Sequence, residues 1–92
     1  TAACFALLRR ALRERQVVRI DYRRADGAGA IRMIRPLGLF AFGAVWLLTA
    51  WCELRGDFRH FRLDRIGRIE LAGRRFRPER GRLLEDALAR LG

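Results

Sequence analysis

Residues 37–52 read Leu-Gly-Leu-Phe-Ala-Phe-Gly-Ala-Val-Trp-Leu-Leu-Thr-Ala-Trp-Cys, an apolar stretch without a charged side chain. A helix that spans a membrane needs about 20 such residues, and this stretch is shorter. Pro36 stands at its head and Gly43 lies within it, and both residue types disfavour a continuous helix. We therefore expect two buried strands joined by a turn at Gly43, in a protein that does not cross a membrane.

Strand signals continue on both sides of this apolar stretch. Residues 17–24 alternate between apolar and polar side chains, which is typical of a half-buried strand. A second strand begins near Ala30 and runs into the apolar stretch, where Pro36 marks an edge or a bend. Further strands are expected at 58–66 and 68–71, with glycine-containing turns at 26–29 and 55–57. About five short strands with tight turns predict a meander that closes into a small β-barrel, because closure removes exposed edges.

Helical periodicity marks both ends of the chain, at residues 3–15 and again after Gly81. A chain of 92 residues has room for one hydrophobic core, so we expect a single domain over 1–92. Its expected parts are an N-terminal helix at 1–16, a β-barrel at 17–72, a basic connector at 73–81 and a C-terminal helix at 82–92. The side chains expected to be largely buried are Ile20, Leu39, Trp46, Leu48 and Leu63.

The chain is strongly basic. All twenty basic residues are arginine, and ten acidic residues leave a net charge of +10. Residues 55–82 contain ten arginines and four acidic residues, so this segment carries +6 of that charge. Such an excess favours nucleic acid, a nucleotide or an acidic surface as the partner.

Residues able to form a metal or catalytic site are few. Cys4 and Cys52 are far apart in the sequence, and His60 is the single histidine, so the usual sets of zinc ligands are not available. The sequence contains no glycine-rich phosphate loop, no carboxylate cluster and no Ser-His-Asp order. We therefore expect no catalytic residue, no metal and no cofactor, and two reduced thiols in a cytoplasmic protein.

Arginines recur every three or four residues between positions 55 and 65, interleaved with Phe58 and Phe61. A regular strand would place apolar and charged side chains on both of its faces, so we expect a bulge or bend near residues 60–62. Guanidinium groups bind phosphates and aromatic rings stack on bases, which favours a binding surface. The alternative is a solvated strand face that Asp57 and Asp64 partly neutralise.

With these motifs in view, residues 35–66 resemble a WYL domain. They contain Arg-Pro-Leu-Gly-Leu-Phe at 35–40, Trp-Leu-Leu at 46–48 and Phe-Arg-Leu-Asp-Arg-Ile at 61–66. The segment Arg-Ile-Asp-Tyr-Arg at 19–23 resembles the first strand of that family. Leu47 stands where the family's Trp-Tyr-Leu triplet has tyrosine, which favours a core position for the triplet in this chain.

The resemblance implies a mainly β domain, a small Sm-like (Src-homology-3-type) five-stranded β-barrel with an N-terminal and a C-terminal helix. It implies a ligand-sensing domain of a bacterial transcriptional regulator, and a chain that is a fragment lacking its DNA-binding helix-turn-helix domain. The expected ligand is single-stranded nucleic acid or a nucleotide-like anion. The alternative is a protein-interaction or dimerisation module, with a homodimer as one form. The binding residues expected from the arginine pattern and the resemblance are Arg55, Arg59, His60, Arg62, Arg65, Trp46 and Phe61.

Overall fold

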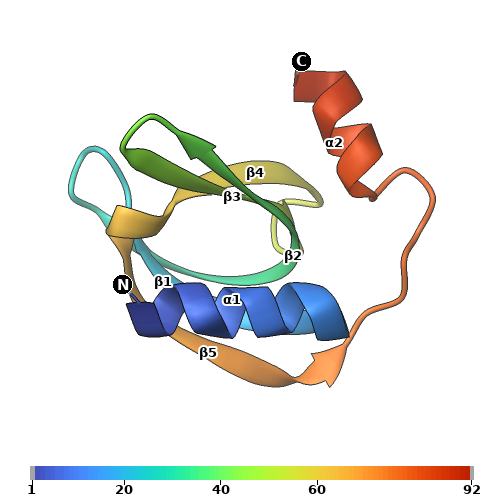
Figure 1. Ribbon diagram of the computed structural model, residues 1–92, viewed down its shortest axis with the longest axis horizontal. Helices are drawn as coiled ribbons and strands as arrows, with labels where there is room; N and C mark the ends of the chain where they lie inside the picture. Colours follow the sequence, from blue (N-terminus) through green and yellow to red (C-terminus); the bar gives the residue numbers. More distant parts are fainter. Residues whose placement is uncertain (1, 92) are drawn as a thin grey trace.

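Five antiparallel strands form one sheet in the order β4-β3-β2-β1-β5, with a helix before it and a helix after it in the chain (Figure 1). The computed structural model describes residues 2–91. Its elements are α1 (Ala2–Glu14), β1 (Gln16–Arg23), β2 (Gly29–Phe42), β3 (Val45–Cys52), β4 (Asp57–Arg62), the 3-10 turn Leu63–Arg65, β5 (Ile66–Arg75) and α2 (Leu84–Leu91). The prediction of a mainly β domain with five strands and two flanking helices is confirmed.

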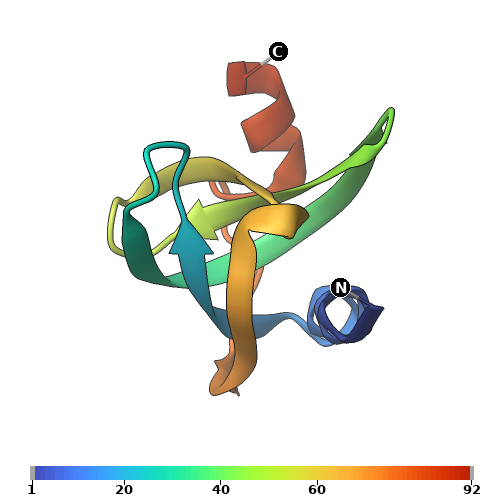
Figure 2. The same cartoon turned by 90° about the vertical axis from the view of Figure 1, so that its left-hand side faces the viewer.

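The sheet curls but does not close into the expected barrel. Its edge strands are β4 and β5, and within residues 2–91 no strand pairing joins them. The 3-10 turn Leu63–Arg65 breaks the strand expected at 58–66 and redirects the chain into β5. The long strand β2 bends where its pairing with β3 shifts register between Pro36 and Gly38, and Figure 2 shows the resulting curvature. The predicted bend near 60–62 is therefore found immediately after Arg62.

The core lies between the curled sheet and α1. Leu8 and Ala11 of the helix are fully buried, and the helix covers apolar side chains of the sheet. Burial is confirmed for Ile20, Leu48 and Leu63, whereas Leu39 is only partly buried. The sheet residues of this core cluster are Val18, Ile20, Ile34, Leu48, Ala50 and Phe61, joined by Leu63 of the 3-10 turn.

The expectation that Trp46 belongs to the core is wrong. Its side chain is 41% exposed, and its ring stands edge-on to Phe5 of α1 at 4.8 Å between centroids. Trp46 is the second residue of β3, next to the β2–β3 turn at Gly43, so the sheet extends beyond the helix at this point. A side chain that would be buried in the middle of the sheet is therefore partly exposed near the tip of the β2–β3 hairpin.

Helix α2 packs on the opposite face of the sheet. Gly38 permits this packing, since a Cβ at that position would lie 2.9 Å from the Phe40 ring and 3.2 Å from Leu84 of α2. Ala87 is fully buried, and Arg90 forms an ion pair with Asp57 at 2.7 Å. The connector begins at residue 76, later than expected, because β5 extends to Arg75. Neither helix within residues 2–91 has the length and apolar character that a membrane crossing requires.

Candidate anion-binding site

Four arginines meet in a groove at the end of the sheet that carries the β1–β2 and β3–β4 turns. The groove has a volume of about 190 Å³ and no carboxylate lines it. We call it the four-arginine groove, after Arg24, Arg32, Arg55 and Arg59; its other lining residues are Tyr22, Ala30, Cys52, His60 and Phe61.

The charge in this groove is weakly compensated. Among residues 2–91, no carboxylate forms an ion pair with Arg24, Arg32 or Arg55. Arg59 has Asp57 at 3.8 Å, near the limit for an ion pair. Arg32 and Arg59 each donate one hydrogen bond to a backbone carbonyl, of Ile31 and Phe58. Guanidinium groups without a close carboxylate keep most of their donors available to an anion, and several in one groove concentrate the positive potential.

The β3–β4 turn places Arg55 at the groove. Gly56 adopts a φ of 61°, a conformation that glycine accepts at no steric cost, and its N–H donates to the Cys52 carbonyl at 2.9 Å. At the other end of the turn, the Glu53 N–H donates to the Met33 carbonyl at 3.1 Å. The Glu53 carboxylate accepts hydrogen bonds from Arg74 and Arg35. The turn that carries Arg55 is thus attached to β2 and β5.

This attachment predicts a loss of stability in acid. The hydrogen bond from Arg74, aided by Arg35, lowers the pKa of Glu53 below its ordinary value of 4.5, although partial burial opposes the shift. A carboxylate with a lowered pKa stabilises the folded state above its unfolded pKa, and this contribution is lost as the pH falls through the folded pKa. We expect Glu53→Gln to be less stable than the parent protein at neutral pH, with a difference that shrinks below about pH 4.5. Urea denaturation across this range measures it, and a difference that stays constant with pH would contradict the assigned ion pairs.

Four of the seven expected site residues come together in the groove, namely Arg55, Arg59, His60 and Phe61. The Nδ1 atom of His60 lies 2.8 Å from Oγ1 of the fully buried Thr49, which fixes the ring. Phe61 is only 5% exposed and packs edge-on against Tyr22 at 5.0 Å. Its ring supports the groove from beneath and is too buried to serve as the stacking surface that the sequence suggested.

The other three expected residues lie elsewhere. Arg62 is on the opposite face of β4 from Arg59, and both oxygens of Asp64 bind its guanidinium, at 3.0 and 2.7 Å. Arg65 lines a neighbouring hollow. Trp46 is six residues from Cys52 along β3, roughly 20 Å at the usual rise per residue.

Sequence reasoning did not assign Tyr22, Arg24 and Arg32 to the site. A signal for them existed in the β1–β2 hairpin, whose pairing sets Tyr22 opposite Ala30. Residues two apart on a strand share a face, so the expected turn at 26–29 places Arg24 beside Tyr22 and Arg32 beside Ala30. The Tyr22 hydroxyl accepts a hydrogen bond from the backbone N–H of Arg62 at 3.1 Å, which ties β1 to β4 across the sheet.

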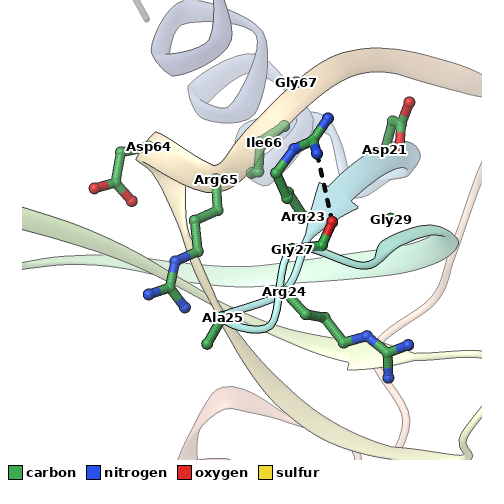
Figure 3. A pocket seen from close by; sticks show the side chains of 10 residues that line it. All are labelled: Asp21, Arg23, Arg24, Ala25, Gly27, Gly29, Asp64, Arg65, Ile66 and Gly67. Atoms are coloured by element: carbon green, nitrogen blue, oxygen red, sulfur yellow. Dashed lines mark hydrogen bonds between the residues drawn. The ribbon is translucent and has the colours of Figure 1, made fainter.

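A second hollow, of about 360 Å³, adjoins the groove through Arg24, which lines both (Figure 3). We call it the turn hollow, because it lies between the β1–β2 turn and the 3-10 turn that precedes β5. It contains acidic as well as basic side chains. Its lining residues are Asp21, Arg23, Arg24, Ala25, Gly27, Gly29, Asp64, Arg65, Ile66 and Gly67.

Neither cavity has the ligands of a metal centre. Within residues 2–91, no three His, Cys, Asp or Glu side chains gather closely enough to hold a metal ion. Cys4 is partly buried and Cys52 is buried, and both are free thiols. The chemistry that the two cavities offer is hydrogen bonding and charge, mainly through guanidinium groups.

Comparison with known proteins identifies relatives among transcriptional regulators. A family model described as the WYL domain matches residues 3–71. The DNA-binding transcriptional repressor CapW of Escherichia coli, and that of E. coli strain KTE188, are each 38% identical over 65 residues, which are 70% of this chain. The chain spans 22% of the length of these curated relatives. The solved structure of proteasome accessory factor B/C (PafBC) of Arthrobacter aurescens superposes with a TM-score of 0.76 and 32% identity, over 80% of this chain and 12% of that one.

Proposed function

This chain belongs to the WYL domain family, and we propose that it is the ligand-sensing domain of a bacterial transcriptional regulator. Its ligand is single-stranded nucleic acid or a nucleotide-like anion, and the four-arginine groove binds it. We further propose that the curled sheet is of the Sm-like type, and that the regulator contacts duplex DNA through another domain. The CapW relatives are DNA-binding transcriptional repressors, which supports this last point.

The observation that carries the proposal is the composition of the groove. Four arginines line it together with His60 and without a carboxylate. Guanidinium groups present their N–H donors in a planar fork that matches phosphate oxygens, so one group makes two hydrogen bonds to one phosphate. A groove that is rich in donors and positive charge and has no carboxylate fits a phosphate backbone. We propose a binding role without catalysis, because no carboxylate lines the groove beside His60 and the Cys52 thiol there is buried.

The salt dependence of binding tests this function. We expect short single strands to bind, with a log–log slope of about −0.7 for each phosphate neutralised, or about −2 to −3 if each arginine of the groove neutralises one. Fluorescence polarisation of a labelled oligonucleotide over a series of salt concentrations measures the slope, and unlabelled nucleotides serve as competitors. Absence of binding at low salt would contradict the proposal.

A protein-interaction or dimerisation module is the second candidate, and the tip of the β2–β3 hairpin favours it. Phe42 is 62% exposed and Trp46 is 41% exposed, with no charged residue between them. Exposed apolar side chains that cluster often mark a contact surface. Analytical ultracentrifugation tests the dimerisation form of this candidate, which requires self-association that Phe42→Ser abolishes.

A further inference from the structure

The turn hollow differs from the four-arginine groove in one chemical respect. Three arginines line it (Arg23, Arg24 and Arg65), but two carboxylates do as well, Asp21 and Asp64. A phosphate group has only acceptor oxygens at neutral pH and is served by donors alone. The edge of a nucleobase carries donors and acceptors together. The mixed lining of the turn hollow therefore suits a base better than a phosphate.

Asp21 is the free acceptor in this hollow. Although the chain contains twenty arginines, no ion pair or side-chain hydrogen bond involves the Asp21 carboxylate among residues 2–91. Asp64, by contrast, has both oxygens bound by Arg62 at 3.0 and 2.7 Å. An exposed carboxylate that stays unpaired in so basic a protein retains its full capacity to accept hydrogen bonds.

Donors stand beside this acceptor. Arg23 is two residues from Asp21 on β1, so the two side chains leave the same face of the strand. One N–H of Arg23 donates to the Gly27 carbonyl at 3.4 Å, drawn as a dashed line in Figure 3. This contact holds the guanidinium against the turn and leaves its other donors free. Arg65 projects from the 3-10 turn on the other side of the hollow (Figure 3).

The backbone around the hollow is open to a flat ligand. A Cβ at Gly27 or at Gly29 would have nothing within 4 Å, so the space beside these two glycines is open. Arginine planes stack on bases in proteins that read single strands, and Arg24 and Arg65 both line the hollow. The volume of about 360 Å³ lies within the range of roughly 300–1,000 Å³ that small ligands occupy.

We propose that the turn hollow is a base-reading subsite that selects guanine, while the phosphates of the same nucleic-acid strand lie in the four-arginine groove. This inference rests on the proposed function. Guanine has two adjacent donors, N1–H and the N2 amino group, which match the two oxygens of Asp21. It also has two adjacent acceptors, O6 and N7, which match the fork of Arg23. The other bases offer a carboxylate one donor group each. Arg24 lines both cavities, so it stands where the sugar-phosphate chain passes from one to the other.

Fluorescence polarisation with matched single strands tests the subsite. The probes are a short oligothymidylate and the same strand with one central guanine, measured against the whole chain at fixed salt. We expect the strand with guanine to bind about tenfold more tightly, within the range for one bidentate base contact. Inosine in place of guanine lacks the N2 amino group, and 7-deazaguanine lacks the N7 acceptor. Each substitution should therefore lose part of the advantage.

The decisive variant is Asp21→Asn, which keeps the size of the side chain but replaces one acceptor oxygen by an NH₂ donor. It should abolish the preference for guanine, and it should change the affinity for oligothymidylate far less than the affinity for the strand with guanine, because thymine offers the carboxylate one donor where guanine offers two. The matched control is Asp26→Asn, because Asp26 lies in the nearby β1–β2 turn, accepts from the Ala28 N–H at 2.9 Å and does not line the hollow. This control should keep the preference.

The outcomes separate the subsite from the function on which it rests. If the two strands bind equally tightly, or if Asp21→Asn retains the preference, the base-reading subsite is overturned while the phosphate groove stands. If neither strand binds to the parent protein, the proposed function fails and the subsite fails with it. A preference that Asp21→Asn removes and Asp26→Asn retains supports both.

Discussion

Leu48→Ala is expected to lower the free energy of unfolding by about 2–5 kcal/mol, the range for truncating a fully buried leucine. Leu48 is 0% exposed and lies in the middle of β3, opposite Leu39 on one neighbouring strand and Phe61 on the other. The truncation leaves a cavity that three packed strands cannot fill by moving together. Urea denaturation, followed by circular dichroism, measures the change.

Trp46→Ala is the matched control on the same strand. Trp46 has a larger side chain, but it is 41% exposed and its aromatic partner is Phe5 of α1. An aromatic pair of this kind contributes about 0.5–1.5 kcal/mol beyond the area that it buries, so the variant should lose clearly less stability than Leu48→Ala. Equal losses would mean that the hairpin tip is packed into the core, against the arrangement described here.

Arg59→Ala is expected to weaken binding of a single strand by about 1.5–3 kcal/mol, the range for a hydrogen bond to a charged group. Arg59 lies in the four-arginine groove, and its only carboxylate within residues 2–91 is Asp57 at 3.8 Å. The variant should also make the log–log salt slope shallower by about 0.7, since one phosphate contact is lost. Polarisation titrations at several salt concentrations give both values.

Arg62→Ala is the control, because it removes the same formal charge from the same strand. The sequence pattern alone groups Arg62 with Arg59, yet Asp64 binds the Arg62 guanidinium through both oxygens. We expect little loss of affinity from this variant. If both variants weaken binding equally, the attraction is diffuse and follows the net charge of +10. Arg59→Lys refines the test, since lysine keeps the charge but lacks the planar fork and should not restore full affinity.

Local patterns in the sequence predicted the elements of the fold well. Residues 37–52 form the end of β2, a turn at Gly43 and the whole of β3, as their lack of charge and the glycine indicated, although Phe42 and Trp46 are exposed and not buried as expected. The turns around Gly27 and Gly56 also lie where expected, and both glycines have positive φ. These features depend on residues close together in the chain, where side-chain alternation and the freedom of glycine act directly. The four predicted residues at positions 55–61 line one groove for the same reason, since they are close together in the chain.

The tertiary structure alone decided how these elements meet. It left the sheet curled but unclosed and placed Arg62 beside Asp64, because a 3-10 turn replaces the end of the strand expected at 58–66. It exposed Trp46, because this residue lies beside the β2–β3 turn. It also brought Arg24 and Arg32 of one hairpin to Arg55 and Arg59 of another. A two-residue alternation fixes which face a side chain occupies, but only the packing of strands distant in sequence fixes which faces and ends come together. The sequence by itself therefore determined a basic five-stranded domain with an arginine-rich strand, and the long-range pairing of its strands determined which arginines form the site.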